Sequence, residues 1–219
     1  MTTHFQREID AIKRELLALG GLVEETLWKA VQAFNERDES LADEVVETDR
    51  EIDRREVQME EECLKVLALH QPVAVDLRLI VAVLKINNDL ERIGDLSVNI
   101  ARRARFLASH PQVRAPFDLP GMARQAQAML HDSLDAVVNM DTALARRVCE
   151  ADDEIDAVHR QTFGLVRDEI RAHPDQLDAL THILSTSNHL ERIGDLATNI
   201  AEDVIYLVEG RIVRHRSKV

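Results

Sequence analysis

The sequence predicts an all-α fold made of two tandem, antiparallel three-helix bundles. The first observation is a duplication, because eleven of the fourteen residues in 188–201 repeat those in 88–101. The second is composition: aromatic residues make up only 3% of the chain, so residues that favour strands are scarce. The third is apolar periodicity in steps of three and four residues, which is typical of amphipathic helices. Long helices joined by short turns bury their apolar faces most simply as antiparallel bundles.

The first two helices have recognisable limits. Residues 5–35 carry an apolar face, which the Gly20-Gly21 pair interrupts. Since glycine costs about 1 kcal/mol relative to alanine inside a helix, we expect this pair to weaken or bend the helix. Asp38 or Ser40 can cap a second helix that reaches about Leu69.

A third helix and a proline-rich linker complete the first half. Pro72 fits the first turn of this helix, where a missing N–H costs nothing, and the helix reaches about Ser109. Residues 110–120 contain three of the five prolines and form the expected boundary between the halves. The predicted organisation is a first bundle over 1–109, a linker over 110–120 and a second bundle over 121–219.

The second half repeats this order of helices. The predicted helices of this half cover residues 121–140, 141–173 and 174–210. Pro174 takes the part of Pro72 at the start of the last helix. An earlier echo supports the duplication, since five of the seven residues in 47–53 recur in 150–156. Each half has about one hundred residues, which is long enough for its own hydrophobic core.

Both halves carry carboxylates four residues apart, which places each pair on one helix face. The predicted metal ligands are these pairs and two asparagines that follow them: Asp49, Asp53, Glu91, Asp95, Asn99, Asp152, Asp156, Glu191, Asp195 and Asn199. Asp203 continues the stripe on the sixth helix. A single acidic stripe is usually a solvated face, but like charges at i and i+4 disfavour a helix by about 0.2–0.5 kcal/mol per pair. The helices that carry them are consecutive and antiparallel, so the carboxylates can converge.

Such convergence predicts oxygen-rich cation sites, of the kind that suits Mg²⁺, Ca²⁺, Mn²⁺ or oxidised iron. Glu56 and His159 each lie three residues beyond an acidic pair and can add ligands. Gly94 and Gly194 stand at matching positions in mid-helix. Close packing against a neighbouring helix explains these glycines more simply than backbone access near a ligand, and both interpretations stay open.

Charge and hydropathy narrow the class of protein. A net charge of −13 argues against direct nucleic-acid binding, which usually needs a concentrated basic surface. No run of eighteen apolar residues is present, and the polar start lacks the apolar segment of a signal peptide, so we expect a cytoplasmic protein. Cys63 and Cys149 lack metal-site spacing and are expected to be free thiols. The basic segment 211–218 is either a solvated helix end or a contact with an anionic surface.

Four segments carry a family resemblance. They are Gln-Pro-Val-Ala-Val-Asp-Leu-Arg at 71–78, Leu-Glu-Arg-Ile-Gly-Asp at 90–95 and again at 190–195, and residues 199–210. In these segments the chain resembles the PhoU family of phosphate-uptake regulators. The resemblance implies two bundles related by a pseudo-twofold axis, and multinuclear metal in some members at an acid followed four residues later by Asp. Iron, zinc, manganese and magnesium are the expected metals.

The resemblance also implies partners. It indicates a dimeric, non-enzymatic protein that conveys the state of a phosphate ABC transporter, through its ATPase subunit, to a sensor histidine kinase. The resemblance further implies that such a protein represses the phosphate-starvation response when phosphate is plentiful and meets the membrane only through its partners. Because the second half lacks a full copy of segment 71–78, partner binding is expected in the first half only. Arg78, placed on the acidic side of the third helix, is the predicted contact.

A carboxylate-rich or di-iron helical protein is the alternative function. Di-iron bundles need Glu-x-x-His motifs on two helices of one bundle. Only Asp156-Ala-Val-His159 comes near this pattern, and it occurs once. No nucleophilic triad or glycine-rich phosphate loop is present, so the sequence favours a protein that is not an enzyme.

Overall fold

A computed structural model describes residues 3–211, and within them six α-helices and one 3₁₀ turn account for all regular structure. The elements are α1 (Thr3–Glu36), α2 (Glu39–His70), α3 (Val75–Ala108), α4 (Leu119–Asn139), α5 (Thr142–Ala172), η1 (Pro174–Gln176) and α6 (Leu177–Glu209). The all-α prediction is confirmed. Residues 212–218 of the basic C-terminal segment lie outside the described residues.

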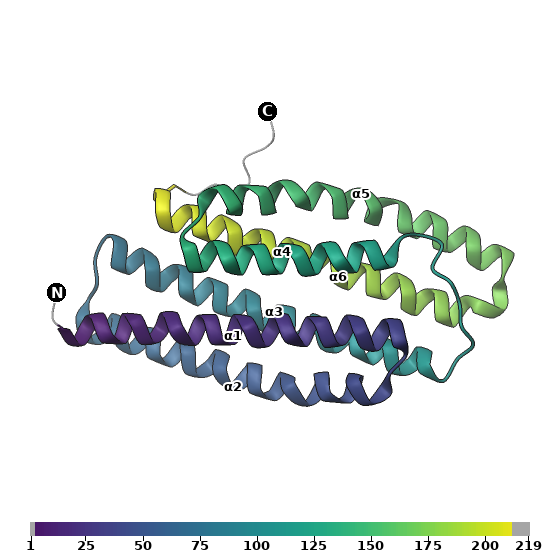
Figure 1. The fold of residues 1–219 in the computed structure, drawn as a ribbon, viewed down its shortest axis with the longest axis horizontal. Coiled ribbons are helices and arrows are strands. Elements are labelled where there is room, and N and C mark those ends of the chain that lie inside the picture. The colour runs from purple at the N-terminus through teal and green to yellow at the C-terminus, as the bar shows by residue number, and fades with distance from the viewer. Residues whose placement is uncertain (1–2, 212–219) are drawn as a thin grey trace.

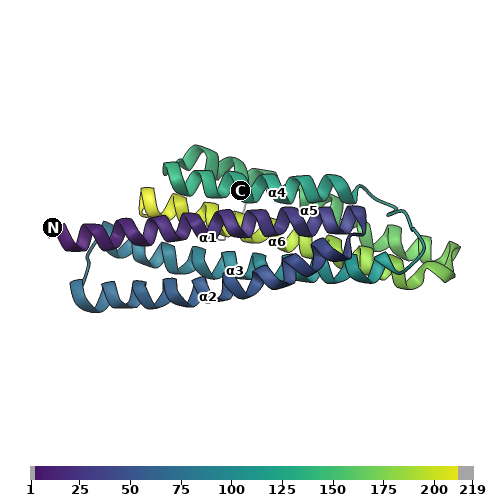
Figure 2. The ribbon, with the colours of Figure 1, turned by 60° about the horizontal axis from the view of Figure 1, so that its bottom comes forward.

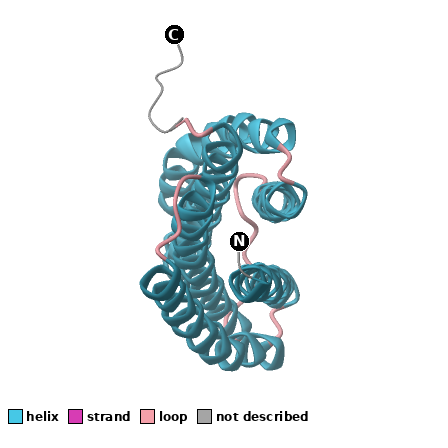
Figure 3. Ribbon diagram, turned by 90° about the vertical axis from the view of Figure 1, so that its left-hand side faces the viewer, coloured by secondary structure: helices cyan, strands magenta, loops and turns pink. Residues whose placement is uncertain are grey.

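The helices form two antiparallel three-helix bundles that lie side by side (Figure 1). The first bundle contains α1, α2 and α3, the second contains α4, α5 and α6, and α3 packs against α6 at the junction. A curved layer contains α2, α3, α6 and α5, in this order in space. Helices α1 and α4 cover one side of this layer (Figures 2 and 3). The predicted pair of tandem bundles is therefore confirmed. Among residues 3–211, no helix is long and apolar enough to cross a membrane.

Aspartates begin three of the helices. Asp38 accepts a hydrogen bond from the backbone N–H of Leu41 at 3.0 Å, Asp118 caps α4 and Asp141 caps α5 in the same way. These side chains satisfy N–H groups that have no partner inside the helix. The Asp38 alternative for the second helix is thus confirmed.

The predicted start of the third helix is wrong by one turn. Pro72 precedes α3, which begins at Val75, because the chain needs residues 71–74 to reverse direction. Gln71 ends α2 in the left-handed region with φ 45°, and Ala74 takes φ 51° just before α3. Pro174, likewise, opens η1 and not α6 itself.

Gly20 and Gly21 do not interrupt α1, which is continuous from Thr3 to Glu36. A Cβ at Gly20 would lie 2.8 Å from Cδ2 of Leu134 on α4, whereas one at Gly21 would meet no atom within 4 Å. Gly20 therefore allows α1 and α4 to approach closely. This contact between bundles offsets the helix-propensity cost that the sequence led us to expect.

The α3–α6 contact joins the bundles through polar as well as apolar groups. Asp203, predicted on the acidic stripe, is instead buried here, 3.2 Å from Nζ of Lys85. It lies eight residues after Asp195, which rotates it by about 80° around the helix and away from that stripe. At the other end of the contact, Nε of Arg103 donates to Oγ of Ser185 at 3.2 Å.

Candidate functional site

Two acidic clusters form where consecutive helices of each bundle pack together. The first acidic cluster comprises Asp49, Asp53 and Glu56 of α2 with Glu91 and Asp95 of α3. The second acidic cluster comprises Asp152, Asp156 and His159 of α5 with Glu191 and Asp195 of α6. The structure thus brings the two predicted pairs of each half together. The charges of one cluster act on one another and not on those of the other cluster, so the clusters are separate.

Asp49 and Asp152 occupy equivalent positions at the centres of the clusters. Burial, followed by the charges of Asp53 and Asp95, raises the pKa of Asp49 to about 6. Burial, followed by Asp195 and its acidic neighbours, raises the pKa of Asp152 to about 6. Within residues 3–211, Oδ1 of each aspartate is buried and has no hydrogen-bond partner. A buried acceptor without a donor is costly, so each position suits a cation.

Other carboxylates of the clusters respond to the same environment. Burial first, and neighbouring acids second, raise the pKa values of Glu91, Glu191 and Asp195. Burial also raises the pKa of Glu56, with further effects from Glu60 and Asp53. Since like charges confined together favour the protonated forms, each cluster carries more negative charge than its surroundings neutralise.

The two clusters differ at one position. His159 of the second cluster hydrogen-bonds through Nε2 to Oδ1 of Asn188 at 2.8 Å, and its Nδ1 lies 3.6 Å from Oε1 of Glu191. In the first cluster Glu56 stands at the equivalent position, and Nδ2 of Asn87 donates to its backbone carbonyl at 2.9 Å. Neither Asn87 nor Asn188 is among the predicted metal ligands, although Asn188 lies on the predicted polar stripe of the sixth helix. The repeated block at 188–201 contains Asn188, but its counterpart Asn88 is not the residue that bonds Glu56.

Gly94 and Gly194 let the helices of each bundle approach closely. A Cβ at Gly94 would lie 3.2 Å from Cδ1 of Ile52 and 3.4 Å from Oδ1 of Asp49. A Cβ at Gly194 would meet Ile155 and Asp152 at similar distances. The interpretation as close helix packing is confirmed, and the same approach presses each central aspartate against the neighbouring helix.

Asn99 and Asn199, the remaining predicted ligands, are half-buried. Oδ1 of Asn99 accepts a hydrogen bond from Nη1 of Arg102 at 3.4 Å, and the charge of Arg102 lowers the pKa of Asp49. In the described part of the chain, no three His, Cys, Asp or Glu side chains are gathered closely enough to hold an ion as they stand. Metal binding at these clusters would therefore require side-chain rotation.

Arg78 does not join the acidic side of α3, which corrects its predicted placement. It lies thirteen residues before Glu91, a rotation of about 140° around the helix. Its guanidinium faces α6 instead, where Nη1 is 3.5 Å from the position of a Cβ at Gly210. A cation at the C-terminal end of a helix is favourable, since the helix dipole is negative there.

Cys63 and Cys149 are free thiols, buried and half-buried respectively, as predicted. Burial is the first cause that raises the pKa of Cys63 to about 12 and that of Cys149 to about 11. Neither thiol is therefore activated as a nucleophile or a ligand at neutral pH.

Comparison with known proteins covers both halves. The family model "PhoU domain" matches residues 16–104 and 119–204. A relative from Aquifex aeolicus (strain VF5), a "Phosphate-specific transport system accessory protein PhoU homolog", is 37% identical over 96% of this chain and 95% of its own. The crystal structure of PhoU from Pseudomonas aeruginosa superposes with a TM-score of 0.92 at 38% identity, covering 94% of this chain and 100% of that one.

A second solved structure, the phosphate transport system regulatory protein PhoU from Streptococcus pneumoniae, has a TM-score of 0.84 at 30% identity. It covers 95% of this chain and 99% of its own. Both halves of the duplication, both bundles and the acidic motifs thus fall within the matched lengths. The chain belongs to the PhoU family.

Proposed function

We propose that this protein is an accessory regulator of phosphate-specific transport. The observation that carries the proposal is the match along both bundles to relatives named for that system. The protein acts by binding and not by turnover, which fits the absence of a catalytic motif in the sequence. An accessory role of this kind requires surfaces that partners can recognise.

The proposal extends to partners and place of action. The protein, as a homodimer in the cytoplasm, binds the ATPase subunit of a phosphate ABC transporter and a sensor histidine kinase. It represses the starvation response when phosphate is plentiful. The family resemblance supports this role. The exposed turn between α2 and α3 and the first residues of α3, which together carry segment 71–78, support an asymmetric partner contact in the first bundle.

Metal binding at the two acidic clusters is the second part of the proposal. The orphaned Oδ1 atoms of Asp49 and Asp152, together with the raised pKa values of both groups, fit a resident cation. The paired carboxylates would hold the ion, with Asn99 and Asn199 at the edge of each cluster. Iron, zinc, manganese and magnesium are the candidates, and a bound ion would supply positive charge that neutralises the acids.

Deletion of the gene tests the regulatory role. A phosphate-starvation reporter should become active in phosphate-rich medium and should be silenced again by the wild-type chain. Pull-down with the transporter ATPase and the sensor kinase checks the partners directly. A reporter that stays silent after a clean deletion, in a strain without a second family member, would contradict the proposal. Rapid oxidation of ferrous iron by the purified protein would favour the di-iron alternative.

A further inference from the structure

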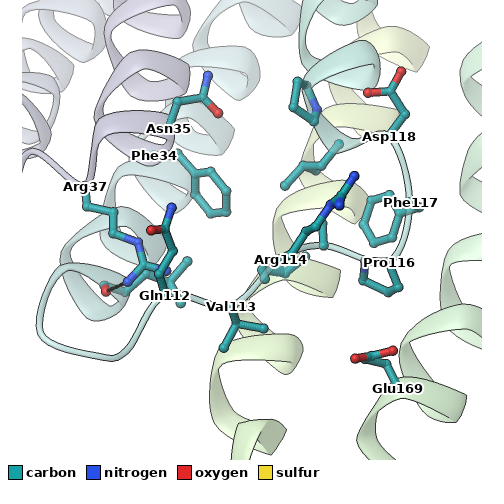
Figure 4. Close-up of a pocket in the computed structure, with 15 residues that line it drawn as sticks. Phe34, Asn35, Arg37, Gln112, Val113, Arg114, Pro116, Phe117, Asp118 and Glu169 are labelled. Atoms are coloured by element: carbon teal, nitrogen blue, oxygen red, sulfur yellow. Dashed lines mark hydrogen bonds between the residues drawn. The ribbon is translucent and has the colours of Figure 1, made fainter. Parts of the chain in front are cut away.

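An open cavity lies where the two bundles and the linker meet (Figure 4). This is the end of the molecule that holds the turn between α1 and α2 (Figure 1). Its volume is about 750 Å³, within the range of roughly 300–1,000 Å³ that small-molecule sites occupy. The cavity draws its walls from both bundles, with Phe34 from α1, Phe117 from the linker, Glu169 from α5 and Ile183 from α6. A molecule bound there would touch both halves of the duplication at once.

Among the residues that the structure describes, one cation of the cavity has no partner. The side chain of Arg114 lies between Phe34 and Phe117 in Figure 4, and it makes no ion pair or hydrogen bond with any of residues 3–211. Arg37, the other arginine of the cavity, is occupied. Its Nη1 donates to the carbonyl oxygens of Leu107 at 2.8 Å and His110 at 2.7 Å. Arg37 therefore fixes the path of the linker, whereas Arg114 is available to a ligand.

The acids of the cavity are engaged elsewhere. Oδ1 of Asp118 accepts the backbone N–H of Gly121 at 3.0 Å as the cap of α4. Oε1 of Glu169 lies 3.6 Å from Nε2 of His173, four residues further along the chain. Neither carboxylate pairs with Arg114, so the guanidinium charge is not neutralised within the cavity.

We propose that this cavity binds a small organic anion that joins a flat aromatic ring to one anionic group. The ring packs against Phe34 and Phe117, since aromatic faces favour offset or edge contacts with one another. Arg114 binds the anionic group, because a guanidinium presents parallel donors that match a carboxylate, sulfonate or phosphate. The amides of Asn35 and Gln112 line the same space and can bond polar atoms of the ring.

Fluorescence titration of the full chain with 8-anilino-1-naphthalenesulfonate, an aromatic sulfonate, tests the proposal. The wild-type protein should bind the probe at one site. Arg114→Glu should weaken binding at least about tenfold through the lost charge-assisted contact. Ala115→Trp, which fills the cavity, should abolish binding. Arg124→Glu, the same charge change on α4 outside the cavity, should leave the affinity unchanged.

Two controls make the outcome decisive. The first control is thermal unfolding of each variant, which shows whether it is folded. Arg114→Glu and Ala115→Trp also test the site independently of each other. Inorganic phosphate, added at constant ionic strength, should not displace the probe, because it lacks a ring. Absence of wild-type binding, equal affinity in the wild type and both cavity variants, or displacement by phosphate alone would each overturn the proposal.

Discussion

At the scale of single residues, the central aspartates Asp49 and Asp152 are in an environment that a bound cation would stabilise. Asp49 and Asp152 have pKa values of about 6, so both are mainly ionised at neutral pH although burial and like charges oppose it. An Oδ1 atom without a donor adds to the cost in each case. A bound cation would remove both penalties, whereas a plain solvated face would have neither buried oxygens nor raised pKa values.

Stability in the absence of metal should therefore depend on pH. The folded-state pKa of each aspartate lies above its ordinary value of 3.8, so between about pH 4 and pH 6 the folded state binds more protons than the unfolded state. Stability falls as the pH rises through this window. With metal removed by a chelator, the double variant Asp49→Asn/Asp152→Asn should be more stable than the wild type at about pH 7.5. Its advantage in stability over the wild type should be smaller at about pH 5.

Urea midpoints of both proteins at the two pH values measure this difference. Asp132→Asn, a partly buried acid on α4 outside both acidic clusters, is the matched control and should follow the wild type. Identical pH dependence in the wild type and the double variant would show that these two aspartates do not strain the fold.

Replacement of Gly94 by alanine should cost more stability than replacement of Gly21, the other glycine inside a helix that is compared with it. Alanine improves helix propensity by about 1 kcal/mol at either site. At Gly94, however, the new Cβ would meet Ile52 and Asp49 at 3.2–3.4 Å, whereas at Gly21 it would meet nothing within 4 Å. Overpacking costs roughly 1–3 kcal/mol. Gly94→Ala should thus be less stable than Gly21→Ala by about that amount in denaturant titrations, and equal stability would contradict the packing role.

At the scale of elements, α3 and α6 contact each other through two polar pairs that occupy corresponding positions of the duplication but differ in chemistry. Positions one hundred apart are equivalent in the repeated block, so Ser185 is the counterpart of Lys85 and Asp203 the counterpart of Arg103. One copy of the contact is an ion pair, Lys85 with Asp203, and the other is a hydrogen bond from Arg103 to Ser185. The bundles are therefore held together asymmetrically although their backbones are alike.

His189 of α6, whose Nε2 lies 3.3 Å from Oγ of Ser185, makes this contact sensitive to acid. Burial, followed by the charges of Arg103 and Arg192, lowers its pKa to about 4 from the ordinary 6.5. The unfolded state then binds more protons, so the stability that His189 contributes is lost as the pH falls from about 6.5 to about 4. His189→Gln should lose less stability over this range.

Denaturant midpoints across the same pH range check the prediction. His131→Gln provides a contrast, because its hydrogen bond with Glu24 raises the pKa of that histidine. His131→Gln should deepen the loss of stability in acid, because the free energy that protonated His131 contributes to folding is fully present only below the unfolded-state pKa of this histidine. The same response in both histidine variants would contradict the assignment.

The turn between α2 and α3 is the element proposed for partner binding. Val73 in this turn and Val75 at the start of α3 expose 73% and 58% of their surface, so apolar side chains are accessible to a partner there. Arg78→Glu should weaken binding of the transporter ATPase or the sensor kinase. It also places a negative charge near the end of α6, which costs about 0.3–1 kcal/mol, so only a small fall in the melting temperature is expected.

Affinity measurements with both purified partners check this prediction. Arg171→Glu makes the same change in the last turn of α5, at the other end of the molecule, and should leave both affinities unchanged. Unaltered affinity of Arg78→Glu for both partners would show that Arg78 serves only to hold α3 against α6.

At the scale of the whole molecule, the fold could be predicted because every helix carries its own apolar periodicity. The four acidic pairs could be placed because they repeat. Asp203 and Arg78 were misplaced, since small rotations add up over two or more turns and the α3–α6 contact depends on tertiary packing. The orphaned Oδ1 atoms and the cavity beside Arg114 also escaped prediction. They arise from how closely helices approach and from the path of the linker, which periodicity does not specify.

The content of bound metal per chain tests most directly the claim that the molecule carries two separate metal sites. Protein reconstituted with iron, manganese, zinc or magnesium, and freed of excess metal, would be compared with Glu91→Ala/Asp95→Ala and with Glu191→Ala/Asp195→Ala. Each double variant should lose about half of the metal, because the clusters are separate. A wild-type chain that retains none of the four metals, or variants that retain as much as the wild type, would contradict the account.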